Sequence, residues 1–155
     1  MKVRPLDVDD CAALVTLLDQ LGYPSSERSI RDRVGFLLAD QTVGCWVAED
    51  DIGVAGLLTG HLSRNIETDG PSARLTALVV DERTRAQGTA RLLTVAFEDW
   101  ARANGATKAG LSSNTSRQDA HSAYRKLGWA VTALSFTKVL SAPADGADES
   151  AGSAG

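Results

Sequence analysis

Residues 73–104 constrain the fold more than any other part of the chain. They begin with a strand-like segment that ends in the apolar run Leu78-Val79-Val80, pass through a polar loop, and then repeat apolar residues at helical spacing. The apolar run predicts a strand that is buried on both faces. The i, i+4 ladders within residues 92–101 predict a long amphipathic helix. Since such a strand needs covering layers on both sides, the segment predicts a layered protein that mixes strands and helices.

The rest of the chain alternates between the same two periods. Further strands are expected at residues 2–6, 43–48, 52–59, 107–113 and 129–140, and further helices at residues 7–21, 25–39 and 117–127. Asp7 and Asp10 have the charge pattern of a capping box at the start of the first helix. Gly22 ends that helix, and Gly105 stands where a left-handed cap is expected after the helix of residues 88–104. The order of elements predicts an α+β fold with at least six strands.

Length and composition predict one domain followed by a tail. A chain of 155 residues with 43% hydrophobic and 23% charged residues suits a single globular domain. Residues 141–155 are rich in Ala, Gly and Ser and contain no large apolar side chain, so we expect a domain at residues 1–140 and a disordered acidic tail. Net charge is −4, but three acids lie in the tail, so the domain itself carries only −1. This near-neutral balance excludes the basic surface that nucleic-acid binding needs.

Cysteine, histidine and hydropathy patterns exclude further classes of protein. Cys11 and Cys45 are too few for a disulfide framework and are expected to be buried as small apolar residues. Two Cys and two His, far apart in the chain, give no metal-ligand spacing, so no metal is expected. The first thirty residues contain no long apolar run, which predicts neither a signal peptide nor a membrane span. We therefore expect a cytoplasmic protein with no membrane partner.

The loop at residues 81–88 joins the buried strand to the helix that begins at Gly88. The free N–H groups and the dipole of a helix N-terminus attract anions, and Gly88 lets a phosphate approach the backbone. Arg83, Arg85 and Arg91 add positive charge around it. These residues predict a diphosphate site, although an ordinary strand-to-helix turn with solvated arginines explains them slightly more simply. Neither the P-loop motif nor the dinucleotide fingerprint G-x-G-x-x-G is present.

Two motifs carry a resemblance to a known family. The segment Val80-x-x-x-x-Arg85-Ala86-x-Gly88-x-Ala90 resembles the pyrophosphate-binding motif of the GNAT superfamily of N-acetyltransferases. Downstream, Ala120-His121-x-x-Tyr124-x-x-x-Gly128-Trp129 is similar to the helix-to-strand signature of that family. The resemblance covers residues 1 to about 140. It implies a mostly antiparallel, twisted central sheet of six to seven strands, flanked by about four helices.

The resemblance implies that the chain binds acetyl-CoA as a cosubstrate. The backbone of Leu78, Val79 and Val80 is expected to pair with the pantetheine arm. Around the pyrophosphate we expect Arg85, Ala86, Gln87, Gly88, Thr89 and Ala90. Asn114, at the end of the next strand, is a further candidate for contact with the pantetheine, although it can equally form a turn with Thr115-Ser116.

Tyr124 is the catalytic residue that the resemblance implies. Its phenol is expected near the thioester sulfur, where it protonates the departing thiolate, because a phenol with a pKa of about 10 is neutral at working pH. No cysteine is placed to form an acyl-enzyme, so the amine is expected to attack the thioester directly.

The sequence says least about which residues bind the acceptor amine. His61, at a strand end, and Tyr23, after the first helix, are weak candidates for substrate contacts, and a histidine that simply faces solvent explains His61 as well. Some relatives carry a glutamate base on the fourth strand, but residues 73–80 contain no carboxylate. The proton of the amine is then expected to leave through water, with Glu67, Asp69 and His61 as the alternatives.

The sequence therefore predicts an acetyl-CoA-dependent N-acetyltransferase that acts on a primary amine of a small molecule or peptide. The alternative is a catalytically silent acyl-CoA sensor or partner-binding module on the same fold, since a fold does not determine a function. Aminoglycosides, polyamines, amino acids and protein N-termini all remain open as acceptors. A homodimer is compatible with the resemblance.

Overall fold

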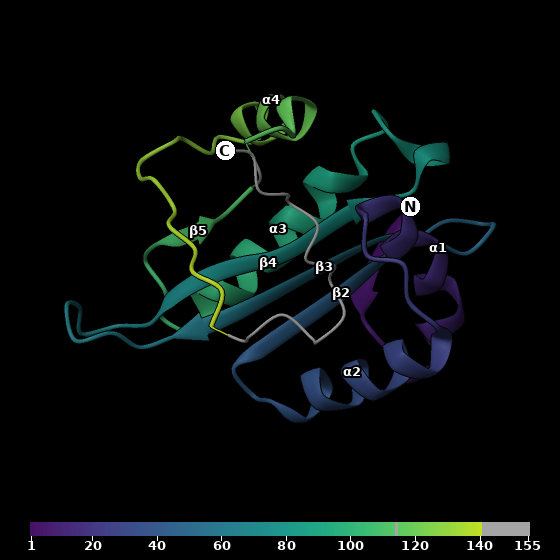
Figure 1. Cartoon of the computed structure of the whole chain (residues 1–155), viewed down its shortest axis with the longest axis horizontal. Coiled ribbons are helices and arrows are strands. Elements are labelled where there is room, and N and C mark those ends of the chain that lie inside the picture. Colours follow the sequence, from purple (N-terminus) through teal and green to yellow (C-terminus); the bar gives the residue numbers. More distant parts are fainter. Residues whose placement is uncertain (114, 141–155) are drawn as a thin grey trace, which may run out of the picture.

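The computed structural model describes residues 1–113 and 115–140 (Figure 1). Its elements, in chain order, are β1 (Lys2–Pro5), η1 (Val8–Asp10), α1 (Cys11–Leu21), α2 (Glu27–Ala39), β2 (Val43–Glu49), β3 (Val54–Ser63), β4 (Ser72–Val80), η2 (Glu82–Thr84), α3 (Thr89–Ala103), β5 (Ala109–Leu111) and α4 (Gln118–Lys126). Asn114 and the predicted disordered tail at residues 141–155 lie outside the described residues. No helix among the described residues is long and apolar enough to cross a membrane.

The strands of the described residues form one mixed sheet of five strands, in the order β1-β2-β3-β4-β5. Neighbours from β1 to β4 run antiparallel, whereas β5 runs parallel to β4. The expectation of six to seven mostly antiparallel strands is therefore wrong in the number of strands and in the type of sheet. The expectation of an α+β fold with about four helices is confirmed by α1 to α4.

Residues 129–140, predicted as a closing strand, contain no regular secondary structure. The apolar side chains of Val131, Leu134 and Phe136 in this segment are exposed. A β-prone segment becomes a strand only where a neighbouring edge offers backbone partners along its length. The edge strand β5 is only three residues long, so it offers too few partners for a strand of the predicted length.

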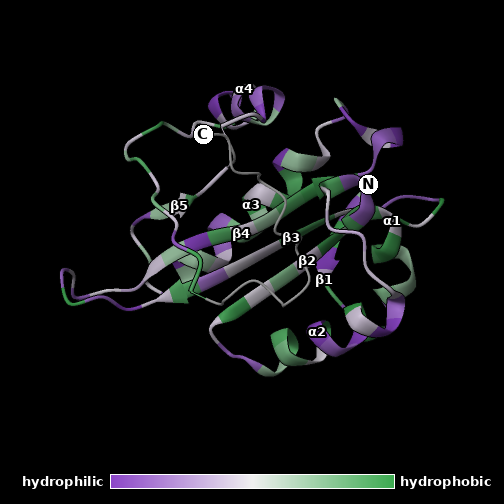
Figure 2. Ribbon diagram, in the orientation of Figure 1, coloured by the Kyte–Doolittle hydropathy of each residue, from purple (hydrophilic) through white to green (hydrophobic). Residues whose placement is uncertain are grey.

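The hydrophobic core consists of one cluster on each face of the sheet. On the face covered by α1 and α2, Leu14, Leu17 and Ile30 are each 1% exposed. On the face covered by α3, Leu93 and Phe97 are fully buried, as the predicted ladder of apolar residues requires. Figure 2 shows largely hydrophobic strands along the middle of the sheet, whereas α4 is largely hydrophilic. The helix α4 therefore belongs to the surface around the core rather than to the core itself.

The helix ends follow the predicted signals. Asp7 and Asp10 form the capping box, in which each side chain accepts a hydrogen bond from the backbone of the other. Gly22 and Gly105 have φ angles of 97° and 82°, the left-handed conformation that favours glycine. These local signals place α1 and α3 against the sheet with defined ends.

Both cysteines are buried, as predicted. Cys11 is 0% exposed and Cys45 is 7% exposed. Burial raises the pKa of the Cys45 thiol to about 11, so this thiol is protonated and unreactive at neutral pH. Within residues 1–113 and 115–140, no group of three His, Cys, Asp or Glu side chains is arranged to hold a metal ion.

Candidate active site

The edge of β4 is the backbone feature around which the candidate site is built. Residues 73–75 of β4 pair with residues 109–111 of β5, and β4 then continues to Val80. Among the described residues, no strand pairs with residues 76–80 on that side. Backbone N–H and C=O groups along this edge are therefore available to a ligand that adds itself as an extended chain.

A bulge in β4 lies where the pairing with β5 ends. Thr59 of β3 pairs with Ala77, while the next residue, Gly60, pairs with Leu75, so Thr76 is the extra residue. The Thr59 and Thr76 hydroxyl oxygens lie 2.7 Å apart, and the Thr76 hydroxyl also donates to the Thr59 carbonyl at 3.0 Å. A bulge bends its strand, which helps β4 and β5 to separate at this point.

A cavity of about 890 Å³ occupies the space beside this open edge. Its walls come from the end of α1, the end of β4, the loop into α3 with the first turn of α3, and one face of α4. Among its lining residues are nine that the sequence predicts for the site: Leu78, Val79, Val80, Arg85, Ala86, Gly88, Thr89, Ala90 and Tyr124. The fold thus brings the loop motif and the tyrosine motif, far apart in sequence, to one cavity.

The loop before α3 has a strained and open backbone. Ala86 has a φ of 63°, unusual for a residue other than glycine, and Gly88 has a φ of 85°. A Cβ on Gly88 would meet no atom within 4 Å, so glycine is required there by backbone conformation and leaves open space above the helix N-terminus. The loop therefore presents the first N–H groups of α3 to the cavity.

Thr89, the first residue of α3, carries a buried polar atom without a partner. The residue is one of those that line the cavity, it is 1% exposed, and its buried Oγ1 makes no hydrogen bond to any described residue. A buried hydroxyl without a partner costs about 1 to 3 kcal/mol. Such a group, beside the N-terminus of a helix, fits a ligand that supplies a hydrogen-bond acceptor.

The predicted arginines differ in what they contact. Arg83 turns away to Asp81, with a hydrogen bond of 3.1 Å between Nε and Oδ2, and does not line the cavity. Arg85 and Arg91 line it, and Arg85 lies 3.4 Å from the exposed Glu82 carboxylate. Two of the three predicted cations therefore border the helix N-terminus.

Tyr124, on α4, is one of the residues that line the cavity. Burial raises the pKa of its phenol above the usual value, and the Arg117 guanidinium opposes this shift. The phenol is therefore protonated throughout the neutral range and can donate a proton. It lines the same cavity as the open edge of β4 at Leu78.

Three of the predicted site residues that the structure describes do not line this cavity, and a fourth is not described. The Gln87 side chain donates to the Arg83 carbonyl at 3.1 Å instead. Tyr23 is 66% exposed in the loop after α1, although the end of α1 itself lines the cavity. His61 lies on β3 opposite Arg74. Asn114 lies outside the described residues.

Sequence reasoning missed two parts of the wall. Gln20 at the end of α1 lines the cavity, and its Oε1 accepts a hydrogen bond of 3.1 Å from the backbone N–H of Glu82. On α4, Ala120, Ala123 and Leu127 line the cavity together with Tyr124. Their i, i+3, i+4, i+7 spacing places them on one face of a helix, so this part of the cavity wall could have been predicted from the sequence. Gln20 had no such signal, because its contact is made between distant segments.

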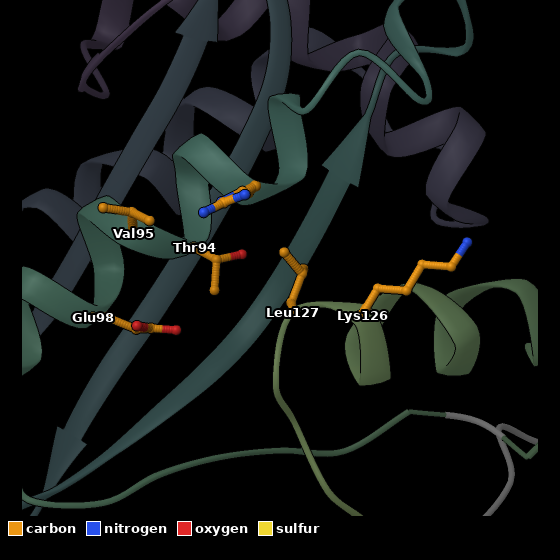
Figure 3. A pocket seen from close by; sticks show the side chains of 6 residues that line it. Thr94, Val95, Glu98, Lys126 and Leu127 are labelled. Atoms are coloured by element: carbon orange, nitrogen blue, oxygen red, sulfur yellow. The ribbon is translucent and has the colours of Figure 1, made fainter.

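A smaller groove of about 300 Å³ continues from the cavity between α3 and α4. Figure 3 shows Thr94, Val95 and Glu98 projecting from α3, with Lys126 and Leu127 at the end of α4. Arg91, Lys126 and Leu127 line both the groove and the larger cavity. The cavity and the groove therefore share the cations Arg91 and Lys126, and the groove is also lined by the carboxylate of Glu98.

Solved structures share this architecture. A transcriptional regulator from Bacillus halodurans has a TM-score of 0.82 at 16% identity, with 90% of this chain and 99% of that chain covered. An aminoglycoside 6′-N-acetyltransferase from Acinetobacter haemolyticus has a TM-score of 0.75 at 21% identity, with 91% and 100% covered. A glucosamine-6-phosphate N-acetyltransferase from Arabidopsis thaliana has a TM-score of 0.77 at 17% identity, with 90% and 98% covered. At these identities the likeness shows a common fold.

Sequence comparison assigns the family. No curated protein matches the sequence. The profile of the Acetyltransferase (GNAT) family, however, matches residues 12–129, which include the open edge of β4, the loop before α3 and all of α4. The match covers most of the chain and agrees with the motifs at Arg85–Ala90 and at Tyr124. The chain therefore belongs to the GNAT family of acetyltransferases.

Proposed function

We propose that the chain moves the acetyl group of acetyl-CoA to a primary amine of a small molecule or peptide. The observation that carries this proposal is the unpartnered hydroxyl of Thr89 at the N-terminus of α3, next to the open backbone of Gly88. Together with Arg85 and Arg91, these groups fit the diphosphate of a CoA ester. Family membership supports the same ligand.

The open edge of β4 is a second observation that supports a CoA ester as the ligand. Leu78, Val79 and Val80 lead directly from the cavity to the loop that would hold the diphosphate. Their backbone groups suit an arm that contains amides, because such an arm can pair with β4 as an added strand. The residues present thus fit CoA both at its charged part and along its amide-bearing arm.

Tyr124 is proposed as the general acid of the transfer. Acetyl-CoA, when bound, supplies an activated acyl group as a thioester. The amine nitrogen forms a bond to the acyl carbon while the bond from that carbon to sulfur breaks. Tyr124 gives its phenolic proton to the departing sulfur and regains one from water, and the proton that the nitrogen loses also goes to water. Backbone N–H groups at the β4 edge can polarise the acyl oxygen.

Direct transfer is proposed rather than an acyl-enzyme. Cys11 and Cys45 are both buried in the core, and neither lines the cavity. Two of the structurally similar proteins are named for N-acetylation of amines, an aminoglycoside and glucosamine 6-phosphate. These names support an amine as the acceptor.

The second candidate is a binding module that holds an acyl-CoA without turnover. It is favoured by the absence of a carboxylate from β4, and a similar structure is named as a transcriptional regulator. Calorimetric titration with acetyl-CoA, followed by thiol release with a panel of primary amines, separates the two candidates. Binding with amine-dependent thiol release supports the enzyme, and binding without release from any amine supports the module. Failure to bind acetyl-CoA contradicts both.

A further inference from the structure

The two ends of β4 differ chemically: the end near the loop before α3 is apolar, whereas the part nearer the beginning of the strand carries Thr76 and Arg74. The cavity residues Val80 and Leu78 lie toward the loop before α3, while Thr76 and Arg74 lie toward the beginning of the strand. At roughly 3.3 Å per residue, Thr76 lies about 13 Å along β4 from Val80. Arg74 follows two residues farther, beyond the bulge. Groups at Thr76 and Arg74 are therefore placed to meet an acceptor rather than the diphosphate.

Thr59, His61, Arg74 and Thr76 form a polar patch on one face of β3 and β4. His61 and Arg74 are directly opposite each other in the register, so their side chains share a face of the sheet. Thr59, two residues from His61, lies on that face as well and is hydrogen-bonded to Thr76. The opposite face at this end is the one packed on α3, where Ala73 and Leu75 are buried. The polar patch thus faces away from α3.

Arg74 is held by the end of β5. Its Nη2 donates to the hydroxyl of Ser112, which lies two residues beyond Gly110, the β5 residue paired with Arg74. The guanidinium consequently extends along the sheet toward the point where β4 and β5 separate. Among the described residues, no carboxylate lies within ion-pair distance of it, in contrast to Arg4 and Arg83. An exposed guanidinium with further N–H donors is therefore available at the mouth of the open edge.

The strands that carry the polar patch, and the neighbouring β5, contain no carboxylate. His61 and Arg74 are the only ionisable side chains on β3, β4 and β5. Asp40, directly after α2, interacts electrostatically with His61, and its Oδ1 already accepts from the backbone N–H and the hydroxyl of Thr42, at 2.8 and 2.7 Å. Glu67 and Asp69 lie in the loop of residues 64–71, which projects beyond the sheet in Figure 1. A polycationic acceptor would find no carboxylate on these three strands.

We infer that the acceptor is a primary amine that also carries an oxyanion, a carboxylate or a phosphate, and that Arg74 binds this oxyanion. The inference rests on the proposed function. A guanidinium recognises both kinds of oxyanion through paired N–H donors. The Thr59–Thr76 hydroxyl pair lies between Arg74 and the cavity, where it can accept from the ammonium group of the acceptor. Arg74 thereby selects anionic amines over neutral amines and over polyamines.

The test compares amines that differ only in the anion. One pair is phosphoethanolamine and ethanolamine, the other is alanine and alaninamide, and spermidine represents the polycations. In the wild-type enzyme we expect kcat/KM for the anionic member of at least one pair to exceed that of its neutral partner about tenfold or more, as charge-assisted hydrogen bonds predict. A preference within the phosphoethanolamine pair indicates that the acceptor carries a phosphate, and a preference within the alanine pair indicates that it carries a carboxylate. Equal rates within both pairs, or a preference for spermidine, overturn the inference.

Binding provides a readout that does not depend on turnover. Each amine is titrated by calorimetry into protein saturated with CoA, so that the diphosphate site is filled and no reaction follows. We expect an anionic amine to bind and its neutral partner to bind about tenfold more weakly or not at all. If CoA binds but no anionic amine does, the inference fails while the proposed function stands. If CoA itself does not bind, the proposed function fails.

Matched variants assign the effect to Arg74. Arg74→Gln is expected to reduce the preference for the anionic amine to within about twofold while leaving CoA affinity unchanged. Arg74→Lys should restore part of the preference, because it keeps the charge but loses the paired donors. Arg64→Gln removes the same charge from the exposed loop of residues 64–71 and should keep the full preference. A preference that persists in Arg74→Gln assigns the oxyanion to another group and refutes the role of Arg74.

Discussion

The guanidinium of Arg4 donates hydrogen bonds of 2.8 Å to both carboxylate oxygens of Asp10, and so joins β1 to the start of α1. Asp10 also accepts from the backbone N–H of Asp7 at 2.9 Å. Its side chain is only 9% exposed, so water screens the pair weakly. The Arg4 guanidinium therefore holds the pKa of Asp10 below its usual value, although burial opposes the shift.

This pair predicts how stability depends on pH. Since the pKa of Asp10 is lower in the folded state than the unfolded value of about 3.9, its stabilising effect is complete above that value and is lost as pH falls through the folded pKa. Asp10→Asn is expected to reduce the free energy of unfolding at neutral pH by roughly 2 kcal/mol. The difference from wild type should shrink in acid. Urea unfolding across pH measures both effects, with the exposed Asp9→Asn as control, and a difference that is independent of pH contradicts the assignment.

Gly88→Glu tests the diphosphate site. The added carboxylate would occupy the open space above the N-terminus of α3 and repel an anion there. We expect acetyl-CoA affinity to fall below detection in calorimetry while the circular dichroism of the fold is retained. Gly88→Ala has the same left-handed backbone strain, about 1 to 2 kcal/mol, without the charge. It should bind acetyl-CoA more tightly than Gly88→Glu, and equal loss in both variants would attribute the effect to strain alone.

Thr89→Val separates binding from stability. Removing an unpartnered buried hydroxyl should leave the free protein as stable as wild type, or up to about 2 kcal/mol more stable. Acetyl-CoA affinity should nevertheless fall about tenfold, because a hydrogen bond to the ligand is lost. Thr94→Val is the matched control on the same helix, since Thr94 Oγ1 already donates to the Ala90 carbonyl at 2.6 Å. Thermal unfolding and calorimetry measure the two effects, and a destabilised Thr89→Val with full affinity disproves the assignment.

Tyr124→Phe tests the general acid. Loss of the phenolic proton should lower kcat by roughly 10² to 10⁴-fold and leave acetyl-CoA affinity nearly unchanged. Because burial raises the pKa of the phenol, its protonated form persists to alkaline pH, and any loss of rate from its ionisation should occur at higher pH than for a solvent-exposed tyrosine. Tyr23→Phe, at an exposed position, serves as the control for the substitution. Normal turnover in Tyr124→Phe would contradict this role and would show that the tyrosine contributes only to packing.

Deprotonation of the amine is predicted to proceed through water. β4 carries no carboxylate, so the pH profile of kcat/KM should shift with the pKa of each amine tested. His61 lies opposite Arg74 in the register, and is the ionisable alternative on these strands. A limb that stays at the same pH for all amines, and that disappears in His61→Ala, would identify His61 as the base and refute the water route.

The sequence was sufficient for features that depend on neighbours in the chain. The capping box of Asp7 and Asp10, the end of the first helix at Gly22, the left-handed Gly105 and the apolar ladder of α3 were all predicted from short patterns. The loop motif and the tyrosine motif were also readable, and they indicated the family that the profile match assigns. Patterns of this kind are local, because hydrogen bonding and side-chain periodicity within one element determine them.

Contacts between distant segments were decided only by the tertiary structure. The predicted strand at residues 129–140 is absent because β5 offers an edge of three residues, which no local pattern reveals. Gln20 joins the cavity wall through a bond to the backbone of Glu82, far along the chain. Arg83, predicted at the anion site, turns instead to Asp81.

The sequence by itself thus determined the elements, most of their ends and the residue types of the site. The tertiary structure decided which of those residues share a cavity, that Thr89 keeps a buried hydroxyl without a partner among the described residues, and that Arg74 is held by Ser112 beside the open edge of β4. The physical reason is that strand pairing and burial depend on which surfaces meet, and register between β4 and β5 is a property of two segments rather than of either one.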